Sequence, residues 1–304
     1  MPGHHHADPA PDHREAPAHD DDPAPQGERA GADGDTVIRR PSPPPDATRS
    51  YGLDPAQVYD LRLPRPDGES VGATVLVVHG GFWRAAYDRT HAGPQAQALA
   101  DAGFHVVVGE YRRAGMPGGG VPGTLDDLTA LVAAVEQDPD LPDPLVLVGH
   151  SAGGHLVTWA ANQPWAQRHP HHSVPSRRSD TAGLGGVVAL AGCVDLRATA
   201  RMRLGSDAAP AFVGMTDLDD EAWQVADPMD SLPPRVPVRL VHGDADQIVP
   251  LEVTAGYVSA ARLAGGDVVL DVVAGAGHYA LIDPEHPAFA RVLTAIRSLL
   301  PRAG

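Results

Sequence analysis

Short, almost unbroken runs of apolar residues alternate with helix-forming segments along most of this chain, and this alternation constrains the fold more than any other feature. Runs of this kind are typical of strands that are buried on both faces of a sheet. Strands are expected at residues 59–63 (at an edge of the sheet), 73–79, 105–110, 144–149, 186–191, 238–242 and 268–273. Helices are expected at residues 93–102, 125–137, 152–162, 251–264 and 284–300. Strands that alternate with helices of this length predict βαβ units, and therefore an α/β fold with a mostly parallel central sheet flanked by helices.

Two stretches interrupt the alternation. Residues 194–237 lie between two expected strands and are long for a simple crossover, so we expect a small lid over the carboxyl ends of the strands. Residues 1–47 are acidic and rich in proline, and they contain no Leu, Phe, Tyr or Trp. Such a segment cannot bury enough apolar surface to offset the entropy lost on ordering. We therefore expect a disordered tail over residues 1–47 and one folded domain over residues 48–304.

The composition excludes several classes of enzyme. The chain contains no lysine, so all 23 of its Lys and Arg positions are arginine. A Schiff-base lysine is therefore impossible, which excludes PLP enzymes and lysine-dependent aldolases. The lysine of a P-loop or of a protein kinase is missing as well. The single cysteine, Cys193, cannot form an intrachain disulfide or a cysteine-based metal cluster.

Charge and hydropathy narrow the choice of partners. The net charge of −16 disfavours contact with phosphate backbones and anionic lipid, so we expect neither nucleic acid nor a membrane as a partner. The N-terminus has no apolar segment of the secretory type, and no apolar run reaches transmembrane length. We therefore expect a cytoplasmic protein with a small-molecule substrate. A homodimer is an open alternative to the monomer.

The segment LVLVGHSAGG, at residues 145–154, contains the strongest chemical signal. Its G-x-S-x-G pattern, Gly149 to Gly153, stands between a buried strand and a helix. In this setting the serine of the pattern sits on a sharp strand-to-helix turn that exposes its hydroxyl at the end of the sheet. The helix N-terminus and the amide of Ala152 favour an oxyanion beside it. We interpret Ser151 as a nucleophile and expect its neighbours His150 and His155 to pack or to form hydrogen bonds.

A serine of ordinary pKa needs a base and an acid that orients the base. His278, in a glycine-rich loop after the last strand, is the candidate base, and His242 is its rival. Asp246, in the segment HGDADQIVP, is the candidate acid. Its rivals are Asp244, after a glycine turn, and Asp195, which could cap a helix.

A third signal follows the first long apolar run. The segment HGGFW, at residues 79–83, places two glycines directly after an expected strand. Glycines at this point allow backbone N–H groups to turn toward a reacting carbonyl oxygen.

The segments HGGFWR, EYRR, GHSAGGHL, HGDADQIVP and GAGHYALIDP resemble the α/β-hydrolase superfamily. Within it the chain is most similar to the HGGxW branch, which includes kynurenine formamidase-like (arylformamidase-like) hydrolases and related esterases. The order Ser151, Asp246, His278 is the order expected in α/β-hydrolases. The resemblance covers about residues 55–300, judged by the order of the elements.

The resemblance implies an α/β-hydrolase fold with a small lid between the sixth and seventh core strands. It implies Ser151 as nucleophile, Asp246 as acid and His278 as base. It also implies an oxyanion hole formed by the amides of Gly81, Phe82 and Ala152. No metal and no organic cofactor are implied.

Three aromatic residues near the motifs, Trp83, Trp159 and Tyr279, are candidates for substrate contact, since small-molecule pockets are largely apolar and aromatic. With them, the sequence predicts a serine hydrolase that acts on a small ester or amide, either an arylformamidase of the N-formylkynurenine type or a short-chain carboxylesterase. Two alternatives stay open. One is a serine peptidase of the prolyl-oligopeptidase type, and the other is a non-catalytic ligand-binding protein with a hydrolase fold.

Overall fold

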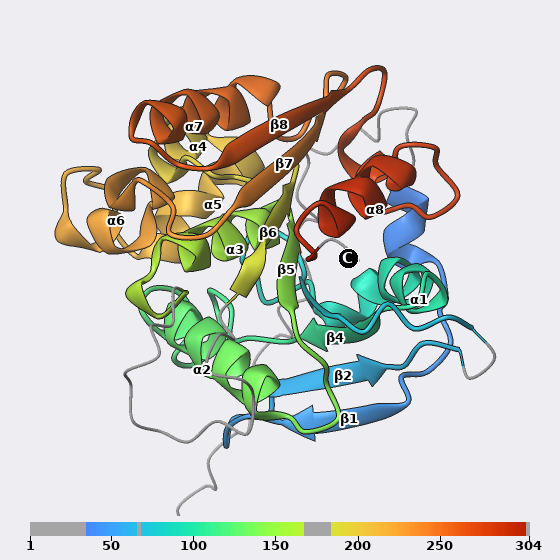
Figure 1. The fold of residues 1–304 in the computed structure, drawn as a ribbon. Helices are drawn as coiled ribbons and strands as arrows, with labels where there is room; N and C mark the ends of the chain where they lie inside the picture. Colours follow the sequence, from blue (N-terminus) through green and yellow to red (C-terminus); the bar gives the residue numbers. More distant parts are fainter. Residues whose placement is uncertain (1–34, 66–67, 167–183, 302–304) are drawn as a thin grey trace, which may run out of the picture.

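The computed structural model describes residues 35–65, 68–166 and 184–301, and an eight-stranded sheet runs through this part of the chain (Figure 1). The strand order is β1-β2-β4-β3-β5-β6-β7-β8, in which β1–β2 and β2–β4 are antiparallel pairs and every other pair is parallel. The strands are β1 (Ala47–Ser50), β2 (Val58–Arg62), β3 (Thr74–Val78), β4 (His105–Gly109), β5 (Leu145–His150), β6 (Leu184–Leu190), β7 (Val238–Gly243) and β8 (Val268–Val273).

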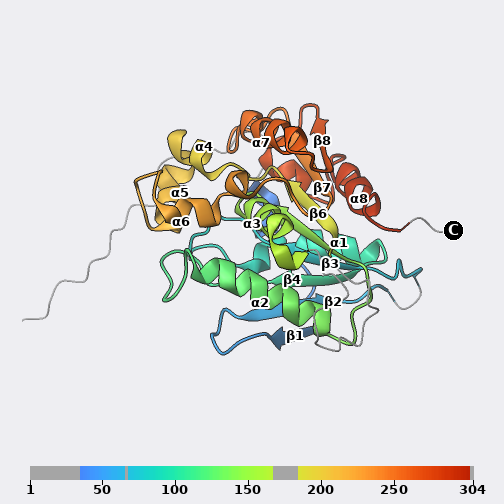
Figure 2. The same ribbon diagram turned by 60° about the vertical axis from the view of Figure 1, so that its left-hand side comes forward.

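Helices cover both faces of the sheet (Figures 1 and 2). The α-helices that follow the strand alternation are α1 (Gly93–Asp101), α2 (Gly123–Gln137), α3 (Ala152–Asn162), α7 (Leu251–Leu263) and α8 (Phe289–Arg297). Buried residues of α2, α3 and α7 belong to one apolar core, and buried residues of α1 and α8 belong to a second. The alternation of helices and strands in the sequence therefore corresponds to two layers of helices around one sheet.

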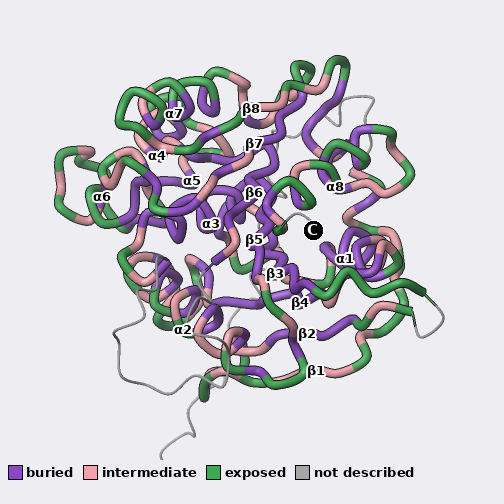
Figure 3. Tube along the Cα trace, in the orientation of Figure 1, coloured by how far each residue is buried: buried purple, intermediate pink, exposed green. Residues whose placement is uncertain are grey.

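The middle strands show why continuous apolar runs were a reliable signal. All five residues of β3 are buried. Leu76 and Val78 belong to the core under α2 and α3, whereas Val75 and Val77 belong to the core under α1 and α8. Successive side chains of a strand point to opposite faces, so a strand between two cores must be apolar at almost every position. Figure 3 shows these central strands as almost continuously buried.

The connection between β6 and β7 contains the segment predicted as a lid. It forms α4 (Leu196–Arg201), α5 (Leu204–Val213), α6 (Glu221–Ala226) and the 3-10 helix η4 (Pro228–Ser231). The connection packs on α3, where the side-chain amide of Asn162 donates to the carbonyl of Pro228 at 2.8 Å. The connection also contacts the loop after β3: the guanidinium of Arg84, in that loop, donates to the carbonyl of Gly205 in the connection.

The predicted tail is wrong for its last part. Residues 1–34 lie outside the described residues, but residues 35–46 are packed on the domain and β1 begins at Ala47. Asp35–Arg39 forms a 3-10 helix, η1, in which Val37 is only 1% exposed. The low apolar content of the whole segment concealed the adjacent pair Val37 and Ile38, which is enough to anchor a short stretch. The same stretch leads into β1, so that β1 and not β2 forms this edge of the sheet.

Candidate active site

Ser151 occupies a sharp turn between β5 and α3. Its backbone has φ 55° and ψ −116°, a conformation that is strained for a residue with a side chain. The flanking glycines allow this turn. A Cβ atom on Gly149 would lie 2.1 Å from the carbonyl oxygen of Gly153, and a Cβ atom on Gly153 would lie 2.0 Å from that of Val78. The G-x-S-x-G pattern is therefore a steric requirement of this turn, which presents the serine at the carboxyl end of the sheet.

His278 and Asp246 form a short hydrogen bond. Nδ1 of His278 donates to Oδ2 of Asp246 at 2.7 Å, and both side chains are almost fully buried. The other carboxylate oxygen of Asp246 accepts from the amides of Ile248 and Val249 at 2.8 and 2.9 Å. Burial alone would raise the pKa of Asp246, but the hydrogen bonds from His242 and His278 outweigh it and hold that pKa well below its ordinary value. Asp246 is therefore an ionised carboxylate that fixes the tautomer of His278.

The three rivals have other partners. Asp195 caps α4 by accepting from the amide of Ala198 at 2.7 Å. Asp244 accepts from the amide of Gly275 at 2.6 Å. His242 is fully buried, with Nδ1 at 2.8 Å from the hydroxyl of Thr254 and Nε2 at 2.9 Å from the carbonyl of Val249, although it also lies 3.3 Å from Asp246. The geometry therefore favours Asp246 and His278 as the acid–base pair.

A pocket lies at the carboxyl end of the sheet, with about 390 Å³ of empty space, part of which is open to solvent. It brings together five residues that the sequence singled out as a site, namely Ser151, His278, Gly81, Phe82 and Tyr279. The remaining lining comes from Ile38, Tyr87, His91, His150 and Ile248, of which sequence reasoning noted only His150.

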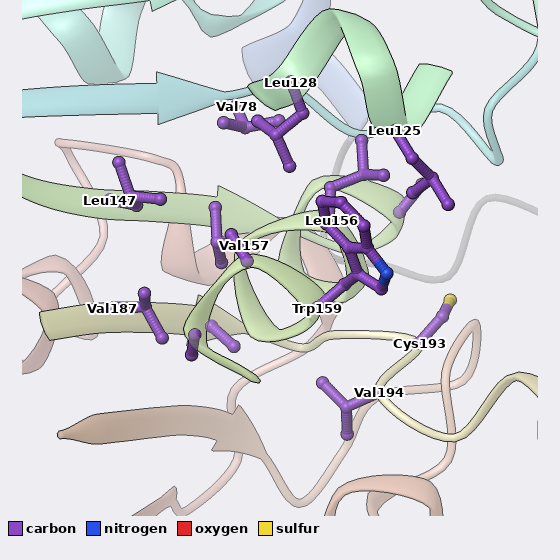
Figure 4. Close-up of a cluster of buried hydrophobic side chains, with 14 of the residues drawn as sticks. Val78, Leu125, Leu128, Leu147, Leu156, Val157, Trp159, Val187, Cys193 and Val194 are labelled. Carbon is purple, nitrogen blue, oxygen red and sulfur yellow. The ribbon is translucent and has the colours of Figure 1, made fainter. Parts of the chain in front are cut away.

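Two of the residues predicted to contact substrate, Trp83 and Trp159, are buried and do not line this pocket. Trp83 is fully buried, stacks on Phe212 with ring centroids 4.8 Å apart, and donates from Nε1 to His155 at 3.2 Å. Trp159 faces the lid connection and donates from Nε1 to the carbonyl of Val225 at 2.8 Å. Figure 4 shows Trp159 within the buried apolar cluster. Both indole side chains point into the core beside the β6–β7 connection. Their nearness to a motif in the sequence did not show which way the side chains point.

The loop after β3 approaches the serine turn closely. Gly81, Phe82 and Trp83 all have positive φ, of 107°, 50° and 55°. A Cβ atom on Gly80 would lie 2.8 Å from the carbonyl oxygen of His150 and 3.1 Å from Cβ of Ser151. Because only glycine permits this approach, the loop places its backbone beside the serine. Ala152, the third residue of the predicted oxyanion hole, is the first residue of α3 and follows Ser151 directly.

Buried hydrogen bonds among His79, Glu110 and Tyr111 hold the loop after β3 in place. Nδ1 of His79 lies 2.8 Å from the carbonyl of Gly80, and its Nε2 lies 3.0 Å from Oε1 of Glu110. The hydroxyl of Tyr111 donates to the carbonyl of His79 at 2.8 Å. Burial alone would raise the pKa of Glu110, but the hydrogen bond and charge of His79 and two backbone amides lower it. The segment EYRR, which directly follows the neighbouring strand β4, therefore holds the backbone of HGGFW in place.

His150 and His155 form hydrogen bonds, as predicted. Nε2 of His150 donates to the carbonyl of His278 at 3.0 Å, and the two rings are 4.5 Å apart. Burial, and then the charge of His278, hold the pKa of His150 well below its ordinary value, so that His150 is neutral. His155 accepts from Trp83 and lies 2.9 Å from the carbonyl of Ala226, and burial lowers its pKa to about 4. His150 thus supports the loop that carries His278, and His155 joins the loop after β3 to the lid.

Neither a metal site nor a membrane span is found among the residues that the structure describes. Among the described residues, no group of three or more His, Cys, Asp or Glu side chains is arranged to hold a metal ion. No helix within residues 35–65, 68–166 and 184–301 is long and apolar enough to cross a membrane.

The chain matches the family model BD-FAE over residues 59–259. It is 32% identical over 113 residues to "Putative acetyl-hydrolase LipR" of Mycobacterium tuberculosis. The aligned stretch covers 37% of this chain and 36% of LipR. It is 30% identical over 117 residues to "Kynurenine formamidase" of Danio rerio, over 38% of this chain and 39% of that protein. The chain thus spans little more than a third of the length of these two relatives.

Solved structures resemble the whole domain. A truncated carbohydrate esterase from gut microbiota gives a TM-score of 0.68 at 20% identity, covering 84% of this chain and 96% of that one. Esterase B from Lactobacillus rhamnosis, inhibited by a tributyrin phosphonate, gives a TM-score of 0.67 at 18% identity. This match covers 87% of this chain and 89% of the esterase chain. The predicted α/β-hydrolase fold, with its mostly parallel sheet and flanking helices, is confirmed.

Proposed function

The chain belongs to the BD-FAE family and has the α/β-hydrolase fold, and from this premise we propose that it is a serine esterase for small esters of short-chain acids. One observation carries the proposal. The pocket that contains Ser151, on its strained turn, also contains His278, and Nδ1 of His278 is hydrogen-bonded to Asp246 at 2.7 Å. A nucleophile, a base and an acid that orients the base are the requirements of acyl transfer through serine.

The proposed reaction has two halves. Nε2 of His278 takes the proton of Ser151 as the serine oxygen attacks the ester carbonyl, and the imidazolium is stabilised by the carboxylate of Asp246. The amides of Gly81, Phe82 and Ala152 stabilise the tetrahedral oxyanion. His278 then gives its proton to the departing alcohol. Water hydrolyses the acyl-enzyme, with His278 again acting as base, and the acid leaves while Ser151 regains its proton.

The preference for short acyl groups follows from the pocket. Its 390 Å³ of empty space includes open solvent, so the room that the lining itself encloses is smaller and suits a small substrate. Apart from the site groups, its lining is apolar or aromatic, so it suits an alkyl or aryl group better than a charged one. The similarity to a putative acetyl-hydrolase supports the same size class.

A substrate series tests this function. We would measure kcat/KM for p-nitrophenyl acetate, butyrate and octanoate and for an aminoacyl p-nitroanilide, with Ser151→Ala as control. We expect the highest value for acetate or butyrate, and none with the control. A preference for the anilide would favour a peptidase instead. Absence of turnover, together with failure of a fluorophosphonate to label Ser151, would favour a ligand-binding protein.

A formamidase is the second candidate, and the aromatic lining favours it. Phe82, Tyr87, His91 and Tyr279 give the pocket four ring side chains that could face the arylamine part of an N-formyl arylamide. The similarity to kynurenine formamidase of Danio rerio agrees with this candidate. Formyl transfer to Ser151 would use the same groups, with the arylamine as leaving group. A kcat/KM for N-formylkynurenine above that for p-nitrophenyl acetate would place the formamidase first.

A further inference from the structure

The described N-terminal segment reaches the pocket. Ile38, in the 3-10 helix η1, lines the same cavity as Ser151 and His278, although no motif surrounds it in the sequence. We propose that Ile38 is a specificity-determining residue that limits the length of the alkyl group accepted by the pocket. This proposal rests on the esterase function proposed above and names the feature that sets its preference for small substrates.

Several contacts hold η1 in place. Val37 is buried in the core that also contains residues of α1 and α8. Arg40 donates to both carboxylate oxygens of Asp283, at 2.7 and 3.2 Å, and lies 3.4 Å from Glu285. The paired Arg–carboxylate contact is a geometrically specific one. Figure 1 shows η1, in blue, on the side of the sheet that carries α1 and α8.

The next residues of the chain are held as well. The guanidinium of Arg62 lies within hydrogen-bond distance of the carbonyl of Pro44 and of the hydroxyl of Ser42, both at 3.4 Å. A Cβ atom on Gly93, at the start of α1, would lie 2.1 Å from Oγ of Ser42. At Ser42 the chain therefore lies against the start of α1 on its way from η1 to β1, and these contacts add to those that hold η1.

The chemistry of the lining gives Ile38 its role. Among the described residues that line the pocket, Ile38 and Ile248 have aliphatic side chains. The other lining residues are aromatic, apart from Gly81 and Ser151. An aliphatic side chain offers no hydrogen bond to a substrate, so it can discriminate only by the space it occupies. Because Val37 anchors η1 in the core and Arg40 anchors it to Asp283, the wall cannot retreat freely before a longer alkyl group.

The experiment changes the size of this side chain in the full chain. We would prepare Ile38→Ala and Ile38→Trp, with Leu263→Ala as a matched control, because Leu263 is 88% exposed on α7 and is not part of the pocket lining. Two ester series separate the two halves of the substrate: p-nitrophenyl esters of lengthening acids, and acetates of lengthening alcohols. Thermal unfolding reports whether each variant folds.

We expect Ile38→Ala to raise the ratio of kcat/KM for the long ester to that for the short ester by about 10-fold in one series, and Ile38→Trp to lower it by a similar factor, as methylene-sized changes in apolar pockets do. The series that responds identifies the acyl or the alcohol side. Leu263→Ala should leave both ratios unchanged. If the wild-type protein is active and both Ile38 variants fold but keep both ratios within about twofold, the proposal is overturned. If the wild-type protein neither turns over esters nor reacts with a fluorophosphonate at Ser151, the esterase function itself has failed.

Discussion

The two sides of the pocket are built in different ways. On one side, the serine turn and the loop after β3 follow strands that are buried on both faces, and backbone conformation determines their shape. Asp246 and His278, which follow β7 and β8, complete this side. On the other side, Ile38 lies in the short 3-10 helix η1, and side chains determine the shape. The first side carries the groups of the proposed chemistry, and the second supplies a wall. We therefore expect changes on the first side to affect rate, and changes on the second side to affect choice of substrate.

The largest effect should come from the centre of the first side. Ser151→Ala removes the proposed nucleophile, and we expect kcat for p-nitrophenyl acetate to fall by roughly 10⁵-fold or more, as with other serine hydrolases that lose this group. The melting temperature should change little, because alanine fits the same space. Residual turnover above about 1% of wild type would remove Ser151 from the mechanism.

Asp246→Asn should give the next largest effect. An amide beside Nδ1 of His278 no longer favours the tautomer that leaves Nε2 free to accept a proton, and loss of such an acid typically slows turnover by about 10⁴-fold. Asp195→Asn is the matched control. Asparagine caps helices about as well as aspartate, so both stability and turnover should be nearly unchanged. An equal loss of turnover in the two variants would contradict the assignment of the acid.

The proposed site was predictable where backbone geometry demands particular residues. The turn at Ser151 needs Gly149 and Gly153, and the approach of the loop after β3 needs Gly80, so these requirements are visible as sequence patterns. The strands β3, β4 and β5 were visible for a similar reason, since burial on both faces demands apolar residues throughout. Asp246 and His278 each follow a strand at the same end of the sheet, but so do the rivals Asp244 and Asp195, and the choice of Asp246 came from the resemblance to the α/β-hydrolases.

The walls of the pocket were predictable only in part: Tyr279, next to His278, lines the pocket, but elsewhere many side chains can fill the same space. Trp83 and Trp159 stand beside motifs but turn into the core. Ile38 stands far from every motif, in a segment whose overall composition indicates disorder. Two adjacent apolar residues among prolines and charges were the only signal, and an average over the segment concealed it. Whether Ile38 faces the pocket depends on the placement of η1 against α1 and α8, which no local pattern specifies.

Acid should destabilise the fold through buried His155, which joins the loop after β3 to the β6–β7 connection. His155 has a pKa of about 4 in the folded protein, against about 6.5 unfolded, so the unfolded chain binds more protons between these values and stability falls as the pH falls. This group alone should lower the free energy of unfolding by about 2 kcal/mol between pH 8 and pH 5. Urea unfolding at both pH values measures the change.

The control for this prediction removes the titrating group. His155→Gln keeps a polar side chain between Trp83 and the carbonyl of Ala226 but cannot take up a proton. Its free energy of unfolding should therefore depend less on pH than that of the wild type, by about the same 2 kcal/mol. An identical pH dependence in both proteins would mean that His155 is not buried in the neutral form.

The smallest effect should come from the anchor of the second side. Arg40→Ala removes the paired contact with Asp283 and frees η1 to shift, while Val37 still holds it in the core. We expect the preference for long over short esters to move in the direction of Ile38→Ala, but by only about threefold, since a partly exposed ion pair is worth roughly 0.2–1 kcal/mol. Turnover of p-nitrophenyl acetate should stay near the wild-type value, because the proposed catalytic groups are untouched. The variant Asp283→Ala breaks the same pair from the other partner, so it should give the same shift, and the double variant should give no more than either single one. A loss of acetate turnover in these variants would show that η1 supports the catalytic groups as well as the wall, and the division of the pocket into a chemical side and a selective side would not hold.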